Sequence, residues 1–346
     1  MLTSSYRRLN LGLIILPVLA LVGCSGAAND PSGEGNQVAV QRPPLGGRPS
    51  AALSLPKLEV SGPATVGGGG AEFTLVVPGG DSIYAAYGGF PSIAAASGEY
   101  DSAIGSNAYS VQLNTNTFAT ACDPTMPYYY MGNQCQGWVQ FVYQAGPGSS
   151  ATVFVEDWIL GIGRGGCPAG WGEYSNPRKS GGYETDCWQD SPHTGAPFVP
   201  ITSLGSFTLS GSISHSGNTV TVSTGSGPVY TATAADYFGI AYGGSWTSAE
   251  FNVFGFGGGS EADFNIFTNI TVGLSAAYGS ASNNYTITAP TCGAGSFTGE
   301  TNNLVLGTCT PHAGVIGLGV PGHLPILKYP GIQFTEDWPL IKIGRL

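Results

Sequence analysis

Between residues 107 and 310 the chain carries a regular succession of short β-type segments, and this pattern limits the fold more than any other feature. The segments are rich in Thr, Val, Phe and Tyr, and Gly, Asn and Ser separate them. Short strands at regular spacing, with turn residues between them, are typical of an all-β sandwich or barrel. We therefore expect strands at 108–118, 137–144, 151–160, 204–213, 218–224, 228–235, 246–254, 265–274 and 283–289.

Glu156 lies inside one of these segments, residues 151–160, which contains no Gly or Pro. Side chains alternate along a strand, so Glu156 shares a face with Phe154 and Trp158. A carboxylate between two aromatic residues is costly to bury as an anion unless it is paired or has a chemical role. The nearest basic residue in the sequence is Arg164, beyond the end of the segment. Glu156 is therefore either a functional carboxylate or the outward residue of an edge strand.

Glu250 occupies a similar position in residues 246–254, on the same face as Asn252. No Lys or Arg occurs between Lys179 and Lys328. If both glutamate-bearing strands belong to one sheet, the two carboxylates could share one cleft. The structural alternative is that Glu250 caps a turn.

The N-terminus has the pattern of an export signal. Arg7 and Arg8 precede an apolar run, 9–21, that is too short to span a bilayer comfortably. The residues Leu21-Val-Gly-Cys24 resemble the lipobox of bacterial lipoproteins. That resemblance implies cleavage before Cys24, a lipid on its sulfur and a place in the cell envelope. The alternative is an ordinary signal peptide cut near Gly23.

Composition shifts divide the chain into five parts. The Gly, Pro and Ser content after the signal predicts a flexible tether. The segment that follows the tether is either a pro-segment or a set of accessory strands. The expected parts are the signal 1–23, the tether 24–70, the segment 71–106, the β-sandwich domain 107–310 and a C-terminal extension 311–346 with a late strand near 331–338.

The charge balance excludes some partners. The net charge is −10, and removing residues 1–23 takes away two Arg, which leaves nine basic and 21 acidic residues, or −12. Such an acidic chain argues against binding nucleic acid. Only 9% of residues are charged, so few ion pairs could be lost at low pH, which suits an acidic medium.

Six cysteines remain after Cys24, and they fall in three close pairs. An exported chain meets an oxidising compartment, where disulfides are expected. Each pair brackets a loop rich in Gly, Pro or Asn, so sequential pairing is predicted: Cys122–Cys135, Cys167–Cys187 and Cys292–Cys309. Zinc is the weaker alternative, because there is no CxxC motif and the four histidines are scattered.

Several aromatic residues lie in or next to the disulfide-closed loops. They include Trp171, Tyr174 and Trp188. Exposed aromatic residues on such loops suit substrate binding or the stacking of sugars. The alternative is that they cover the ends of the sandwich.

The catalytic motifs that are missing from the sequence leave catalysis by Asp or Glu side chains as the remaining possibility. There is no GxSxG, HExxH or P-loop motif, and the paired cysteines leave no thiol nucleophile. Two close carboxylates cannot both ionise easily, so one keeps a proton while the other acts as a base. That arrangement hydrolyses peptides in acid, whereas two carboxylates that flank a sugar ring hydrolyse glycosides.

The order and spacing of several segments resemble the glutamic peptidases, the eqolisin-type acid proteases and the related neprosin-type enzymes. Those segments are Tyr109–Phe118, Gly137–Val142, the strand that contains Glu156, Ser248–Val253 and Ala262–Asn265. The family's fold, a concanavalin-like sandwich of two antiparallel sheets, is what this resemblance implies here. Eqolisins use a Gln and a Glu, and neprosin-type enzymes use two Glu residues.

The resemblance implies an acid-active glutamic endopeptidase that needs no cofactor or metal and acts as a monomer on protein or peptide substrates. Glu250 would then accept a proton from water, and Glu156 would stabilise the oxyanion; Gln140 would take the amide's role if Glu156 does not. The expected site comprises the catalytic Glu156 and Glu250 and the substrate-binding Trp138, Gln140, Trp158 and Asn252. The alternative function is a non-catalytic, lectin-like or adhesive module on a lipid anchor.

Overall fold

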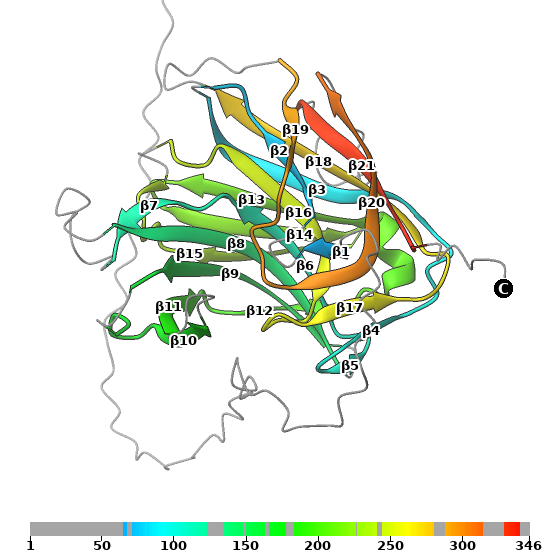
Figure 1. Cartoon of the computed structure of the whole chain (residues 1–346), viewed down its shortest axis with the longest axis horizontal. Helices are drawn as coiled ribbons and strands as arrows, with labels where there is room; N and C mark the ends of the chain where they lie inside the picture. The colour runs from blue at the N-terminus through cyan, green and yellow to red at the C-terminus, as the bar shows by residue number, and fades with distance from the viewer. Residues whose placement is uncertain are drawn as a thin grey trace, which may run out of the picture. The chain divides into compact units, whose positions relative to one another are not determined.

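A computed structural model describes residues 65–67, 71–79, 81–122, 134–147, 150–162, 166–177, 183–225, 227–240, 244–279, 288–313 and 329–339. The chain divides into two units, 1–42 and 43–346, and every described residue lies in the second (Figure 1). The expected signal peptide, Cys24 and most of the expected tether lie outside the described residues. In the part of the chain that is described, no helix has the length and apolarity needed to cross a membrane.

The described residues are almost entirely β-strands, arranged in two sheets that carry three disulfides. Sheet A has eleven strands in the order β15-β14-β13-β3-β18-β21-β20-β17-β4-β5, with β1 pairing with β20. Its strands are β1 (Thr65–Gly67), β3 (Ser82–Ala94), β4 (Glu99–Asp101), β5 (Gly105–Ser106), β13 (Phe207–Ser214), β14 (Gly217–Thr224), β15 (Val229–Ala234), β17 (Glu261–Phe264), β18 (Asn269–Gly279), β20 (Thr301–His312) and β21 (Gly331–Asp337).

Sheet B has ten strands in the order β10-β11-β9-β8-β6-β16-β2-β19, with β12 pairing with β9 and β7 with β8. A 3₁₀ helix, η1 (Ile201–Ser206), precedes β13. The strands of sheet B are β2 (Phe73–Val76), β6 (Tyr109–Thr115), β7 (Phe118–Ala121), β8 (Gln134–Gly146), β9 (Ser150–Leu160), β10 (Gly172–Pro177), β11 (Tyr183–Asp190), β12 (Thr194–Pro197), β16 (Ser248–Gly255) and β19 (Thr291–Ala294).

Apolar side chains from the two sheets interdigitate to form the core. Phe251 on β16 packs against Phe90 on β3, with ring centroids 5.1 Å apart. Glycines on sheet A make room for this packing: a Cβ at Gly88 would lie 2.2 Å from the Phe251 ring, and one at Gly211 would lie 2.3 Å from Phe141. The absence of side chains at two positions of sheet A therefore lets the aromatic rings of sheet B approach closely.

The sandwich extends beyond the range 107–310 expected from the sequence. β3 lies between β13 and β18 in the middle of sheet A, and β21 lies between β18 and β20. Residues 71–106 thus supply strands of both sheets, and removing them as a pro-segment would take a central strand out of sheet A. The late strand expected near 331–338 is β21, whereas most of the expected strand 283–289 lies outside the described residues.

The three disulfides join the pairs that the sequence predicts: Cys122–Cys135, Cys167–Cys187 and Cys292–Cys309, with Cα atoms 5.0, 5.5 and 6.3 Å apart. The first ties the end of β7 to β8 within sheet B. The third connects β19 of sheet B with β20 of sheet A, so it fastens one sheet to the other. Three disulfides are compatible with an extracellular protein.

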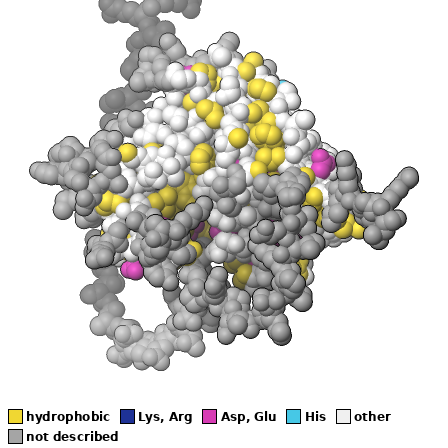
Figure 2. Space-filling view, in the orientation of Figure 1, with side chains coloured by type: hydrophobic (Ala, Val, Ile, Leu, Met, Phe, Trp, Pro, Cys, Tyr) yellow, Lys and Arg dark blue, Asp and Glu magenta, His cyan; other side chains and the backbone are white. Residues whose placement is uncertain are grey.

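Few charges reach the surface of the described residues. All eleven Lys and Arg residues of the chain lie outside the described ranges. Figure 2 accordingly shows scattered acidic side chains among uncharged ones. The carboxylates that matter for the site are mostly buried instead.

Candidate functional site

A row of polar residues crosses five strands of sheet B. The strand register places Glu250 opposite Asn114, Asn114 opposite Gln140, Gln140 opposite Glu156, and Glu156 opposite Asp190. Residues directly opposite each other on antiparallel strands point to the same face of a sheet. We call these five residues the polar row.

Alternation along the strands produces the polar row. On β6 the apolar Val111 and Leu113 are fully buried in the core, while Gln112 and Asn114 between and beside them point to the other face. The same period-two pattern runs along β8, where Gln140 alternates with core residues. The core therefore fixes which side chains reach the opposite face, because a shift of one residue would exchange the two sets.

Side-chain amides connect the middle of the polar row. Asn114 Nδ2 donates to Glu250 Oε2 at 2.8 Å, and Gln140 Nε2 donates to Asn114 Oδ1 at 3.3 Å. Gln140 Nε2 also donates to Gln112 Oε1 at 2.9 Å, and Gln140 Oε1 accepts from Trp158 Nε1 at 2.9 Å. A continuous hydrogen-bonded chain thus runs from Trp158 through two amides to Glu250.

Glu250 is a buried carboxyl group with three donors. Besides Asn114, the Ser296 hydroxyl donates to Oε1 at 2.6 Å and the Phe297 N–H donates to the same atom at 3.1 Å. Burial raises the pKa of Glu250 to about 7, and the nearby charge of Glu300 adds to this, although the three hydrogen bonds lower it. Glu250 therefore holds a proton in acidic solution.

Glu156 and Glu250 share a face, but they do not form a pair in contact. Asn114 and Gln140 lie between them in the register. Three strand spacings separate their Cα atoms by roughly 14 Å along a flat sheet. Both glutamate-bearing strands belong to sheet B, which is the condition for a shared cleft, but this register does not bring the two carboxyl groups within hydrogen-bond reach.

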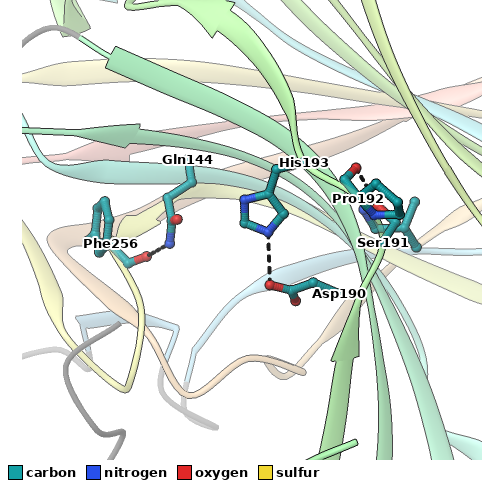
Figure 3. Close-up of polar contacts among 7 residues, drawn as sticks. Gln144, Asp190, Ser191, Pro192, His193 and Phe256 are labelled. Carbon is teal, nitrogen blue, oxygen red and sulfur yellow. Dashed lines mark hydrogen bonds and ion pairs between the residues drawn. The ribbon is translucent and has the colours of Figure 1, made fainter. Parts of the chain in front are cut away.

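The far end of the polar row carries a carboxylate and an imidazole. Asp190 Oδ2 lies 3.0 Å from His193 Nε2 (Figure 3). The His193 ring stacks on Phe154 with centroids 4.3 Å apart. Phe154 and Glu156 are on the same face of β9. Nearby, Gln144 Nε2 donates to the Phe256 carbonyl at 2.7 Å, which ties β8 to the loop after β16.

A second cluster of carboxyl groups surrounds Asn252. Its Nδ2 donates to Glu72 Oε2 at 3.0 Å and to Glu336 Oε1 at 2.5 Å, and all three residues are fully buried. Burial raises the pKa of Glu336 to about 7; burial and the charges of Glu336 and Glu250 raise the pKa of Glu72 well above its ordinary range. The sequence suggests Asn252 as a substrate contact, but its side-chain amide already donates hydrogen bonds to two buried glutamates of the protein itself.

The other predicted contacts lie beside the polar row. Trp138 and Trp158 are opposite each other on β8 and β9, with ring centroids 6.1 Å apart. Trp138 is buried, and its Nε1 has no hydrogen-bond partner in the described part of the chain. Trp158 is partly exposed and is held by its bond to Gln140.

Asp157 points to the opposite face from Glu156, into the core. It is fully buried, and among the described residues neither carboxyl oxygen has a hydrogen-bond partner. Burial raises its pKa well above the ordinary value, and the charges of Asp236, Glu156 and Asp190 raise it further. Burial and these neighbouring charges therefore favour the neutral form of Asp157.

Sequence reasoning does not assign five of these residues to the site: Asn114, Asp190, Ser296, Glu72 and Glu336. The polar alternation of Tyr109–Thr115 is a local signal that could have indicated Asn114. The motif Phe334-Thr-Glu-Asp-Trp338, which echoes Phe154-Val-Glu-Asp-Trp158, was a signal for Glu336.

The arrangement suits proton transfer and amide hydrogen bonding. Within the described residues, no group of three or more His, Cys, Asp or Glu side chains is arranged to hold a metal ion. Comparisons with protein-family models, curated proteins and solved structures found no significant match for this chain.

Proposed function

We propose that this protein is an acid-active endopeptidase of the glutamic type, carried on a concanavalin-like sandwich and anchored to the cell envelope by a lipid on Cys24. The observation that supports it best is the hydrogen-bonded carboxyl–amide chain in the polar row. One end of that row is Glu250, whose pKa of about 7 keeps it protonated in acid. The other end carries Glu156 beside Asp190.

The burial of Glu250 favours a division of roles opposite to the one expected from the sequence. Below pH 7 Glu250 is protonated, so it can donate a proton but cannot accept one from water. The general base must then be another carboxylate on the same face, and we assign this role to Glu156. Two carboxyl groups with different pKa values can serve as acid and base in one reaction, and the proposal requires Glu156 to be ionised where Glu250 is not.

The amides between the two glutamates would bind the peptide group. A substrate lying along the polar row would meet Asn114 and Gln140 in the middle, with a carboxyl group on either side. In the proposed reaction, Glu156 takes a proton from water as the oxygen attacks the carbonyl carbon. The amides and protonated Glu250 stabilise the oxyanion, and Glu250 then protonates the leaving nitrogen.

Access to Glu250 requires a movement of the segment after β19. Ser296 and Phe297 contact its carboxyl group directly, and Glu250 is fully buried. We expect substrate binding to displace these two contacts. The carbonyl oxygen of the substrate would then replace them at Glu250.

Digestion of casein between pH 2 and pH 8 tests the proposal, with the wild type compared with Glu156→Gln and Glu250→Gln. Cleavage in acid that both substitutions impair supports the peptidase. Folded wild-type protein that cleaves neither casein nor a peptide library at any pH favours the non-catalytic, lectin-like module instead.

A further inference from the structure

The turn between β17 and β18 presents two adjacent apolar side chains to solvent. Ile266 is 55% exposed and Phe267 is 64% exposed, more than any other large apolar side chain of the described residues. Tyr100, on the neighbouring strand β4, is 54% exposed. Single exposed apolar residues are ordinary in soluble proteins, whereas a group of them at one place marks an interaction surface.

The backbone holds Phe267 outward in an unfavourable conformation. Its φ is 69°, in the left-handed region that a bulky aromatic residue rarely adopts. The side chain of Asn265 fixes the turn: its Oδ1 accepts from the Ser97 N–H at 2.6 Å. Its Nδ2 donates to the carbonyls of Ala95 at 2.8 Å and Ile266 at 3.0 Å. Strained residues of this kind persist where their surroundings determine the conformation, and they are concentrated at functional sites.

Trp338 lies beside the same turn. Its N–H donates to the Thr268 carbonyl at 2.9 Å, and its ring centroid is 6.4 Å from that of Phe267. In sheet A, β18 pairs with β3 and with β21, so the end of β3, the start of β18 and the end of β21 lie together at the right-hand end of Figure 1. We call four residues at this end the apolar tip: Tyr100, Ile266, Phe267 and Trp338.

The sequence that follows Trp338 has a related composition. Residues 340–346, outside the described residues, read Leu-Ile-Lys-Ile-Gly-Arg-Leu, with four apolar residues, two basic ones and no acid. The acidic residues beside the apolar tip are Asp263, opposite Tyr100, and Asp337. Lys342 and Arg345 therefore balance these two charges, and the apolar character of this end is left to decide its partner.

We propose that the apolar tip inserts into the interfacial region of a lipid bilayer. Tyr and Trp side chains are enriched at membrane interfaces because each joins an apolar ring to a polar atom, and Ile and Phe suit the acyl chains below. A protruding turn needs no matching groove in a fluid lipid layer, and insertion removes exposed apolar surface from water. Because the charges balance, an uncharged phosphatidylcholine surface should be sufficient.

A fluorescent label at residue 266 of the full chain tests the proposal. In a chain that carries Cys24→Ser and Ile266→Cys, the other six cysteines are paired, so the dye NBD attaches at one position. Phosphatidylcholine vesicles should shift its emission to shorter wavelength, and nitroxide-labelled lipid should quench it. The label reports contact at the tip, whichever segment holds the chain on the vesicle.

Val229→Cys in the same Cys24→Ser background is the matched control. Val229 is also exposed, but it lies on β15, at the other end of the strand order of sheet A from β4. Its label should not respond to vesicles. An equal shift at both positions would mean that the chain meets lipid without a preferred surface.

Phe267→Asn separates lipid contact from folding. Asn tolerates a left-handed backbone better than Phe does, so the variant should be at least as stable as the wild type. The emission shift at residue 266 should nevertheless fall about tenfold, because a polar amide replaces the apolar ring. Casein hydrolysis should stay at its wild-type level, so this inference and the proposed function fail separately.

Four results would overturn the inference. They are no shift at residue 266 with vesicles, an equal shift at residue 229, and an unchanged shift in folded Phe267→Asn. The fourth is a shift that grows with protein concentration in the absence of vesicles, because it would identify a second copy of the chain as the partner of the apolar tip.

Discussion

Asn114 Nδ2 donates to Glu250 Oε2 at 2.8 Å, and this one bond joins the carboxyl group on β16 to the amides of β6 and β8. Glu250 is thereby connected to Gln140 through Asn114. A buried acid at the end of an amide chain is a suitable proton donor only while it remains protonated. The pH at which Glu250 ionises should therefore limit the activity.

The first prediction concerns the pH profile of casein hydrolysis. In the wild type, kcat/KM should fall as the pH rises through about 7, because Glu250 loses its proton there. Glu250→Gln keeps the hydrogen-bond donor but cannot deliver a proton, so we expect a loss of roughly 10²–10⁴-fold. Its residual activity should no longer fall near pH 7. A Glu250→Gln enzyme with the wild-type alkaline limb would show that another group controls it.

Glu156→Gln provides the matched comparison for the same profile. This change removes the proposed base while it preserves size and shape, so activity should be lost at every pH. If Glu156→Gln and Glu250→Gln both digest casein at the wild-type rate, the polar row is not the catalytic site. Circular dichroism of each variant at pH 4 would verify that the sandwich has folded.

The second prediction concerns stability. Glu250 and Glu336 have pKa values raised by burial from an ordinary 4.5 to about 7. Between these two values the unfolded chain is ionised while the folded chain still holds the protons, so stability is full below about 4.5 and declines as the pH rises to about 7. Ionisation of each group should lower the free energy of unfolding by on the order of 3 kcal/mol over this pH window. Urea unfolding at pH 4 and pH 7.5 would measure the loss.

Glu336→Gln should flatten this dependence. Its amide is neutral at every pH, and its single oxygen can still accept the shorter of the two bonds that Asn252 and Asn302 donate to the carboxyl group in the wild type. The variant should therefore lose less stability than the wild type between pH 4 and pH 7.5. An identical slope in both proteins would mean that Glu336 does not carry the proton that burial assigns to it.

The sequence predicts how each glutamate is oriented on its own strand, but it does not predict which strands lie between the two glutamates. The alternation of side chains along β9 and β16 can be read from the local sequence, and it predicts which face of its strand carries Glu156 and which carries Glu250. The strands that separate them, β6 and β8, are determined by sheet order, which depends on contacts between distant segments. The sequence also leaves the role of the residues that form β3 undecided, for a related reason. Its Gly88 is explained only by the Phe251 ring on the other sheet.

The third prediction concerns Asp157, which the sequence analysis does not assign to the site. Its carboxyl group is fully buried on the core face; burial raises its pKa most, and the charge of Asp236 is the next largest cause. Ionising this group in the folded state is unfavourable, so its raised pKa lowers stability as the pH increases above the unfolded value. Asp157→Asn should raise the melting temperature at pH 7 and change it little at pH 3. A variant that is less stable at pH 7 would indicate that the ionised carboxylate has a favourable partner.

The last prediction tests how closely the two sheets approach each other. A Cβ at Gly211 on β13 would lie 2.3 Å from the Phe141 ring, so even Gly211→Ala must displace a ring in the core. Overpacking of this kind costs roughly 1–3 kcal/mol. Gly195→Ala on β12 is the matched control, because a Cβ there meets no atom within 4 Å. Urea unfolding should show a lower midpoint for Gly211→Ala and a nearly unchanged one for Gly195→Ala. Because Phe141 lies next to Gln140 on β8, a displaced ring should also disturb the polar row, and casein hydrolysis should fall further than the loss of folded protein explains. Equal stability of the two variants would mean that the sheets pack less tightly at Gly211 than this structure has them.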